Sequence, residues 1–173
     1  FIHLQFYIQN KKIKIKKNIK NINKVIKICE KNKLFLIFPS TASFKFRNKL
    51  RIKKKLNIIN HYTFAKDYCE KKILLSKKNK NLKYTIFRIF NVYGGAINNK
   101  SYFSNIIKQF KKPTKKVKIK YCNSVRDYIH INDLNILIYK SIIKRKVGIF
   151  EAASGINISI KNLTIKIKKN YFI

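Results

Sequence analysis

The fold of this 173-residue chain is decided by the stretch Phe87-Arg-Ile-Phe-Asn-Val-Tyr-Gly94. It overlaps the apolar run Tyr84–Phe90, and the pair Gly94 and Gly95 stops that run. A continuous apolar run of this length is typical of a strand that is buried on both faces of a parallel sheet. The stretch therefore predicts a buried strand whose end, Asn91-Val-Tyr-Gly94, carries polar groups to the edge of the sheet.

Strand and helix patterns alternate on both sides of this stretch. Before it, the spacing of apolar residues predicts two helices, a buried strand ended by Pro39 and a loop: Lys20–Asn32, Tyr62–Lys77, Leu34–Phe38 and Phe44–Asn60. After it, the spacing predicts three helices, the last capped by Ser159, and two strands: Ser101–Phe110, Asp133–Ile143, Ser159–Lys169, Val117–Tyr121 and Val147–Ala152. Such alternation indicates an α/β fold with a mostly parallel sheet and helices on its faces.

The composition is strongly basic, with 42 Lys and Arg against 6 Asp and Glu and a formal net charge of +36. Taken alone, this charge suggests a nucleic-acid partner. However, Lys, Ile, Asn, Phe and Tyr, which codons made only of A and T can encode, supply 112 of the 173 residues. Arg, whose planar fork suits phosphate better than Lys, occurs only 5 times. We therefore attribute the charge to an AT-rich genome and expect no nucleic-acid partner.

The three cysteines, Cys29, Cys69 and Cys122, show neither CxxC pairing nor metal-ligand spacing. We interpret them as small buried or half-buried residues of a reducing compartment. No apolar run approaches the ~18 residues that a membrane helix needs, and no signal-peptide pattern is present. The sequence thus predicts a cytoplasmic protein without a metal or a membrane partner. Because the chain contains no Met, we expect it to be a fragment.

The segment Tyr62-Thr-Phe-Ala-Lys66 carries a YxxxK pattern. On a helix these two positions share one face. A free phenol, with a pKa near ~10, is a poor base, and a neighbouring cation lowers that pKa. Lowering it to about 7 would need roughly 4 kcal/mol of differential stabilisation. The pattern by itself is weak evidence, because Tyr7 with Lys11 and Tyr68 with Lys72 match it as well.

The surroundings of Tyr62 make it the best candidate. Pro39-Ser40-Thr41 places two hydroxyl groups at the carboxyl end of a predicted strand, and Asn91 follows the next predicted strand. Open α/β sheets bind their ligands at this end of the strands. We therefore expect these polar groups to line one crevice.

These segments resemble the NAD-dependent epimerase/dehydratase family, a group of extended short-chain dehydrogenases that act on nucleotide sugars. The resemblance covers about positions 18 to 165 and rests on five segments: Phe38–Ser43, His61–Lys66, Phe87–Gly94, Val125–Leu134 and Gly148–Gly155. The third is close to the family's RxFNxYG, and the fourth, VRDYIHINDL, is close to its RDYIHVxDL signature. The resemblance implies part of a Rossmann-like, doubly wound parallel sheet and part of a small α/β substrate-binding lobe.

The resemblance also implies roles for individual residues. Tyr62 would be the general acid and base at a sugar hydroxyl. Lys66 would hold the nicotinamide ribose and lower the pKa of Tyr62. Thr41 would hydrogen-bond the same sugar hydroxyl, and Phe90 would lie beside the nicotinamide of an NAD cofactor, with NADP also possible.

On the substrate side, the resemblance implies that Asn91 contacts the nucleotide sugar and that Arg126 pairs with its pyrophosphate, a suitable task for a charge-assisted fork. A purely structural role remains an alternative for three of these residues. Thr41 could be a turn residue, Phe90 a core residue, and Arg126 a partner of Asp127. His130 is better explained as a structural histidine than as a catalyst.

The sequence departs from the family pattern in one important respect, since it contains no GxxGxxG loop. Such a loop cradles the pyrophosphate of a dinucleotide at a helix N-terminus. We therefore interpret residues 1–95 as the C-terminal half of a Rossmann-like NAD-binding domain and residues 96–173 as a truncated substrate lobe with returning Rossmann elements. The chain alone is expected to bind NAD poorly, and its full-length relatives are expected to be homodimers.

The leading functional hypothesis is an NAD-dependent nucleotide-sugar epimerase of the UDP-hexose 4-epimerase type, present as a fragment. A 4,6-dehydratase commonly carries Asp–Glu after the catalytic Thr, whereas Ala42 and Ser43 occupy those positions here. A 4,6-dehydratase or a reductase of the same family remains an alternative. Two others come from different classes: a basic nucleic-acid-binding protein and an inactive remnant.

Overall fold

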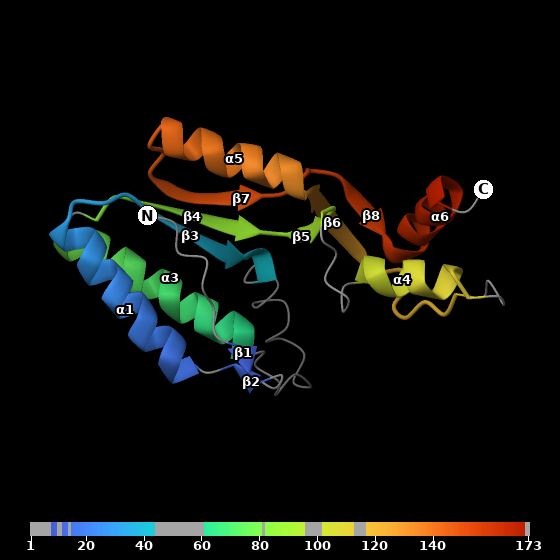
Figure 1. Ribbon diagram of the computed structural model, residues 1–173, viewed down its shortest axis with the longest axis horizontal. Helices are drawn as coiled ribbons and strands as arrows, with labels where there is room; N and C mark the ends of the chain where they lie inside the picture. Colours follow the sequence, from blue (N-terminus) through green and yellow to red (C-terminus); the bar gives the residue numbers. More distant parts are fainter. Residues whose placement is uncertain are drawn as a thin grey trace. The chain divides into compact units, whose positions relative to one another are not determined.

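A computed structural model describes residues 8–9, 12–13, 15–43, 61–80, 82–95, 102–112 and 117–171 (Figure 1). The chain divides into two compact units. The first unit comprises Phe1–Phe90 with Ile138–Ala152, and the second comprises Asn91–Leu137 with Ala153–Ile173. Their assignment to a cofactor-binding half and a substrate lobe stays a prediction.

The first unit is built on a three-stranded parallel sheet in the order β3-β4-β7. Its elements are a short antiparallel pair, two helices and three strands: β1 (Ile8–Gln9), β2 (Lys12–Ile13), α1 (Ile15–Lys31), β3 (Leu36–Thr41), α3 (His61–Lys80), β4 (Tyr84–Ile89) and β7 (Gly148–Ala152). Helices α1 and α3 lie on one face of this sheet, and the C-terminal part of α5 (Ile131–Ile143) lies on the other (Figure 1). This arrangement confirms the predicted α/β fold with parallel strands.

The core of the first unit lies between this sheet and the two helices. Alternate residues of β3 and β4 point into it, and α1 and α3 contribute one buried stripe each: Leu36, Phe38, Tyr84, Ile86, Ile22, Val25, Ile26, Cys29, Cys69 and Ile73. Burying a large aliphatic or aromatic side chain contributes about 2 kcal/mol. The Ser76 hydroxyl donates a hydrogen bond to the Glu30 carboxylate and links α3 to α1.

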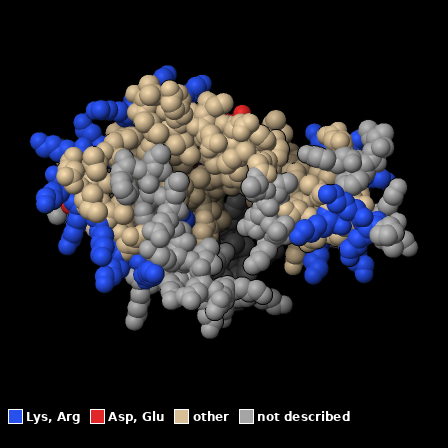
Figure 2. Space-filling model, in the orientation of Figure 1, with Lys and Arg blue, Asp and Glu red and all other residues tan. Residues whose placement is uncertain are grey.

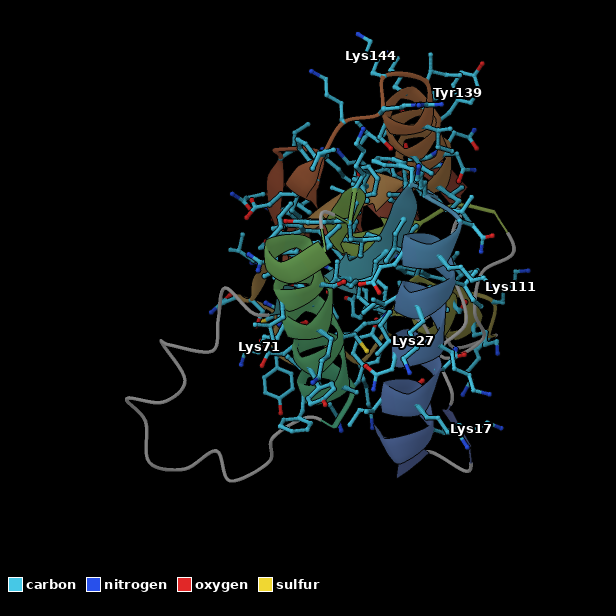
Figure 3. The ribbon with its side chains drawn as sticks, turned by 90° about the vertical axis from the view of Figure 1, so that its left-hand side faces the viewer. Lys17, Lys27, Lys71, Lys111, Tyr139 and Lys144 are labelled. Atoms are coloured by element: carbon cyan, nitrogen blue, oxygen red, sulfur yellow. The ribbon has the colours of Figure 1, made fainter. Side chains whose placement is uncertain are left out.

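Helix α1 is amphipathic, with its lysines on the face opposite the core. Five exposed lysines recur every three or four residues along it: Lys17, Lys20, Lys24, Lys27 and Lys31. Lys17 and Lys27 point outward from α1 (Figure 3). Lys and Arg side chains surround this part of the surface, and few acidic side chains are visible there (Figure 2). This spacing is that of the solvated face of a surface helix.

The second unit contains a mixed three-stranded sheet in the order β5-β6-β8. Its elements are β5 (Asn91–Tyr93), α4 (Tyr102–Phe110), β6 (Val125–His130), the start of α5, β8 (Asn157–Ser159) and α6 (Ile160–Tyr171). Strand β6 runs parallel to β5 and antiparallel to β8. Its apolar cluster joins α4 to α6 through Ile106, Phe110, Leu163 and Ile167.

One predicted strand boundary and one predicted strand are wrong. Pro39 does not end β3, because the strand continues through it to Thr41. Proline is tolerated here because β3 is an edge strand among the described residues, so the missing N–H removes no ladder bond. Residues 117–121 form no strand, although burial alternates over 117–120. The Lys118 N–H donates instead to the Gln109 side chain.

The predicted N-cap of α6 is confirmed. The Ser159 hydroxyl accepts a hydrogen bond from the Asn162 N–H at 3.1 Å and caps α6. Cys29 and Cys69 are buried, but Cys122 is exposed, contrary to expectation. The predicted loop Phe44–Asn60 lies outside the described residues. Among the described helices, none has the length and apolarity needed to span a membrane.

Candidate active site

Helix α3 carries two adjacent stripes that face the sheet. Ala65, Cys69 and Ile73 form a buried, mainly apolar stripe at i, i+4 and i+8. Tyr62, Lys66 and Glu70 occupy the neighbouring stripe at the same spacing. Side chains four residues apart on a helix lie one above the other. The helix therefore presents a phenol, an ammonium and a carboxylate in a row beside the core.

Lys66 connects this polar stripe to the carboxyl end of β3. Its side chain is 5% exposed, and its Nζ donates a hydrogen bond to the Pro39 carbonyl at 2.6 Å. The same nitrogen lies 4.7 Å from the ring centroid of Phe38 and 5.8 Å from that of Tyr62. The structure thus brings Lys66 together with Tyr62 and with the strand end that carries Thr41.

Burial distinguishes this YxxxK pair from the other pair on the same helix. Lys72 Nζ lies 5.4 Å from the Tyr68 ring centroid, a similar separation. Lys72 is only half-buried, whereas Lys66 is buried against β3. A cation in a water-poor position acts more strongly on its neighbours than one in solvent. The Tyr7 and Lys11 pair lies outside the described residues.

Burial dominates the ionisation of Lys66. Desolvation lowers the pKa of its ammonium to about 8, and the electrostatic interactions of Lys66 with Cys69 and Glu70 oppose this lowering. Burial also raises the pKa of the Cys69 thiol to about 11. Cys69 is consequently a neutral thiol at neutral pH, and Glu70 is the carboxylate on this stripe of α3.

Tyr62 departs from its expected behaviour. The sequence predicted that Lys66 would lower the pKa of the phenol, but burial raises it in this structure. The Lys66 ammonium is directed at the Pro39 carbonyl, and desolvation of the phenolate is the dominant effect. Tyr62 is therefore a neutral phenol at neutral pH.

Thr41 ends β3 and is 8% exposed. Its Oγ1 lies 3.0 Å from the Ser43 hydroxyl and accepts a hydrogen bond from the Ser43 N–H at 3.3 Å. This local contact is a hydroxyl turn that follows the strand. Ala42 is buried between the two. The turn provides hydroxyl groups but no ionisable group.

Glu70 and Arg88 form a partly buried ion pair that the sequence did not predict. Arg88 Nη2 lies 2.8 Å from Glu70 Oε2, and Arg88 Nε lies 3.4 and 3.3 Å from the two carboxylate oxygens. The Glu70 side chain is 4% exposed. A lone arginine inside the apolar run Tyr84–Phe90 was the available signal, since a buried charge needs a partner.

Phe90 is the last residue of the first unit before the chain enters the second. It is half-buried, and its N–H donates to the Ala152 carbonyl at 3.1 Å. This bond fixes the backbone immediately after β4. Its side chain remains partly accessible to a ligand.

The predicted substrate residues belong to the second unit. Asn91 is exposed, and its Nδ2 donates to the Asp127 backbone carbonyl at 2.8 Å. Arg126 is also exposed, and its guanidinium donates to the Val125 carbonyl at 3.0 Å. Each residue thus keeps part of its polar group available to a ligand.

The alternative of an ion pair between Arg126 and Asp127 is wrong. Neighbouring residues of a strand point to opposite faces. The buried Asp127 carboxylate instead accepts hydrogen bonds from the N–H and hydroxyl of Ser154 and from the Gly155 N–H, at 2.8, 3.0 and 2.8 Å. Asp127 therefore anchors the turn that precedes β8. Its carboxylate is not the partner of the Arg126 guanidinium.

His130 has structural contacts in keeping with its expected role. Its Nδ1 accepts a hydrogen bond from the Asn132 N–H at 3.3 Å, and its ring meets the Tyr93 ring edge-on with centroids 5.0 Å apart. Gly94 has a φ of +88°, and a Cβ there would lie 2.3 Å from His130 Nε2. The histidine and the glycine thus occupy one tightly packed corner.

The polar groups of the first unit fit part of a nicotinamide cofactor. Lys66 is a buried ammonium with Tyr62 beside it, and Ser40 Oγ is buried at the end of β3 without a hydrogen-bond partner among the described residues. Ammonium, phenol and hydroxyl groups suit the hydroxyls of a ribose. The sequence supplies no glycine-rich loop for the phosphates, so the fit extends to the nicotinamide riboside side alone.

Solved structures share this fold. The UDP-glucuronic acid 4-epimerase from Bacillus cereus in complex with NAD matches with a TM-score of 0.77 and 20% identity, over 97% of this chain and 58% of that chain. DesIV, a dTDP-glucose 4,6-dehydratase from Streptomyces venezuelae with NAD and DAU bound, matches with a TM-score of 0.72 and 12% identity, over 97% and 56%. RMD from Pseudomonas aeruginosa, complexed with NADPH, matches with a TM-score of 0.77 and 14% identity, over 97% and 65%.

These likenesses confirm the predicted Rossmann-like fold, and this chain spans less than two thirds of each of the three solved chains. No curated protein matches the chain. A family model, described as the NAD dependent epimerase/dehydratase family, matches residues 3–150. Because this match covers most of the sequence and agrees with the fold, the chain belongs to the NAD-dependent epimerase/dehydratase family.

Proposed function

We propose that this chain is the catalytic and substrate-side portion of an NAD-dependent nucleotide-sugar epimerase of the UDP-hexose 4-epimerase type. The observation that carries the proposal is the buried Lys66 ammonium, which lies between the Tyr62 ring and the carboxyl end of β3. This is the end of a parallel sheet at which α/β enzymes bind their ligands. Membership of the NAD-dependent epimerase/dehydratase family supports this proposal.

In this proposal Tyr62 Oη exchanges a proton with a sugar hydroxyl, and Thr41 Oγ1 hydrogen-bonds the same hydroxyl. A bound nicotinamide cofactor would accept a hydride from the sugar carbon and return it. Because burial raises the pKa of Tyr62, the phenolate needs positive charge beside it when it takes the proton. Lys66 would supply part of that charge and would hold the cofactor ribose, with Phe90 beside the nicotinamide.

The cofactor is proposed to be NAD, with NADP open. Related structures have been solved with NAD and with NADPH. In a dinucleotide-binding fold an acidic residue or an arginine near the adenosine ribose makes this distinction. The sequence contains no recognisable segment of that kind.

Epimerisation is favoured over elimination by the residues after Thr41. Elimination of water needs additional groups that move protons, and Ala42 and Ser43 have no side chain that ionises near neutral pH. Ser43 is also hydrogen-bonded to Thr41. A 4,6-dehydratase or a reductase of the same family is therefore the second choice.

The substrate is proposed to be a nucleotide sugar held by Asn91 and Arg126. Both side chains are exposed in the second unit, and a guanidinium pairs well with a pyrophosphate. Related structures contain UDP-glucuronic acid or UDP-N-acetylmuramic acid. A cytoplasmic location, a homodimer and the absence of nucleic-acid and membrane partners remain predictions from the sequence.

The test is Tyr62→Phe in the protein that carries this chain, assayed with NAD and UDP-hexoses. We expect turnover to fall by about 10² to 10⁴, as for loss of a general acid–base group, with nearly unchanged nucleotide binding. Tyr68→Phe is the matched control, because it removes a phenol from the same helix and from a second YxxxK pair. Equal turnover in the wild type and the Tyr62 variant would exclude the assigned role.

Two alternatives are tested separately. The coding sequence upstream of Phe1 distinguishes an enzyme from a remnant, since an in-frame strand–GxxGxxG–helix segment favours the former and stop codons favour the latter. A nucleic-acid-binding protein would bind random DNA with steep salt dependence and would be indifferent to Tyr62→Phe. The solvated lysine face of α1 is better explained as an ordinary helix surface.

A further inference from the structure

A row of charged residues crosses the sheet of the first unit beneath α3. Arg88 of β4 is in register with Glu151 of β7, on the side of the strand that also carries Tyr84 and Ile86. Glu70 of α3 meets the Arg88 guanidinium with both carboxylate oxygens within 3.4 Å of Nε. Arg88 is 30% exposed and Glu70 only 4% exposed. The arginine is thus the partly exposed member of the pair, and the glutamate is the buried one.

A buried carboxylate without a partner would take up a proton to avoid its desolvation cost. The Arg88 guanidinium makes charge-assisted hydrogen bonds to Glu70, which favour the ionised carboxylate. The bond to Glu70 raises the pKa of Arg88 in turn. The pair therefore holds a carboxylate at a position from which water is largely excluded.

Lys66 lies one helical turn before Glu70 on the same stripe of α3. Residues four apart on a helix are neighbours on its surface, with their Cβ atoms about 5–6 Å apart. The Lys66 side chain is 5% exposed, as deeply buried as that of Glu70. In such a position a neighbouring carboxylate strongly influences whether the amine carries its proton.

Other titratable groups face Lys66 or the ion pair, and none replaces Glu70. Tyr62 is protonated at neutral pH because burial raises its pKa, and Cys69 is a neutral thiol for the same reason. From β3, Lys66 meets the Phe38 ring and the Pro39 carbonyl. The remaining acids act on Arg88: Asp67 and Glu151.

We propose that Glu70, fixed by Arg88, is a positioning residue that keeps the Lys66 ammonium charged and directed at the carboxyl end of β3. This inference rests on the proposed function of Lys66. Glu70 touches no reacting group and acts only through Lys66. Arg88 acts one step further away, by holding the Glu70 carboxylate with its hydrogen bonds.

The test is an NMR titration of the full chain labelled with ¹³C-lysine, in which Lys66→Arg identifies the Lys66 signal. In Glu70→Gln the pKa of Lys66 moves below its wild-type value, because the opposing carboxylate is gone. Asp67→Asn is the matched control, since it removes a carboxylate from the same helix whose partner is the exposed Lys71. An unchanged Lys66 titration in Glu70→Gln would overturn the proposal.

Glu70→Gln leaves a partly buried guanidinium without its partner and can unfold the protein. The double variant Glu70→Met, Arg88→Met removes both charges, a replacement that is often neutral or stabilising. It also lacks the carboxylate, so the pKa of Lys66 should again lie below the wild-type value. A wild-type titration in the double variant would contradict the proposal equally.

Turnover separates this inference from the proposed function. If the protein is an active epimerase, the alkaline limb of its rate profile moves to lower pH in Glu70→Gln, since Lys66 loses its proton earlier. A shifted Lys66 signal in a protein without any turnover supports the electrostatic role of Glu70 and removes the proposed function. Turnover together with an unshifted Lys66 signal in Glu70→Gln supports the proposed function and removes the electrostatic role of Glu70.

Discussion

Replacing Lys66 by Met tests the burial of its charge through the pH dependence of stability. The folded pKa of about 8 lies below the ordinary value of 10.5 for a free lysine. Between these values the unfolded chain binds more protons than the folded one, so the wild-type protein gains stability as pH rises. Below about pH 8 both states are charged, and the full desolvation cost is present.

The size of this gain follows from the two pKa values. Linkage gives an increase of about 1 kcal/mol between pH 7 and 9 and about 2 to 3 kcal/mol between pH 7 and 10. In Lys66→Met this contribution is absent. The stability of the wild type relative to the variant should therefore rise by these amounts over the same ranges.

Urea unfolding of both proteins at pH 7, 8, 9 and 10 measures the difference. Titration of Cys69, whose pKa burial raises to about 11, lowers stability above about pH 9 in both proteins and largely cancels. Lys27→Met removes an exposed lysine of α1 (Figure 3) and controls for the loss of one charge. A constant difference between wild type and Lys66→Met across this range would refute the claim that a charged Lys66 is buried.

Three further outcomes are expected. Asp127→Ala removes the acceptor of three hydrogen bonds from residues 154–155 and should cost about 3 kcal/mol in urea unfolding; a loss below about 0.5 kcal/mol would count against the anchor. Gly94→Ala should lower the melting temperature, because φ is +88° and the new Cβ meets His130, and an unchanged temperature would contradict this packing. Isothermal titration of the 173-residue chain with NAD should detect no micromolar binding, since the sequence lacks a GxxGxxG loop; micromolar affinity would disprove that dependence.

Local pattern was sufficient for most elements of the fold. The apolar runs at Leu34–Phe38 and Tyr84–Phe90 became β3 and β4, and the helical spacing of Ile22, Val25 and Ile26 became the buried side of α1. The sequence pattern gave the wrong element where the backbone conformation depended on a hydrogen-bond partner elsewhere in the chain. Residues 117–121 alternate as a strand does, yet the Lys118 N–H bonds to Gln109 rather than to a ladder.

The candidate site divides in the same way. The sequence identified Tyr62, Lys66 and Thr41 through motif and strand-end position, and the structure joins Lys66 to Tyr62 and the end of β3. Spacing could not reveal the Glu70 and Arg88 pair, because the two residues lie 18 positions apart and meet only when α3 packs on β4. It also could not reveal that Asp127 binds the turn at 154–155 instead of Arg126.

By itself, the sequence determined the α/β class, the family motifs and the residues able to carry acid–base chemistry, because these depend on residue type and on short-range periodicity. Only the tertiary structure decided the charge state of the site. Burial raises the pKa of Tyr62 and lowers that of Lys66, whereas the sequence alone had predicted a lowered pKa for the phenol. Desolvation depends on what packs around a side chain, and that packing arises only when helix α3 meets the sheet.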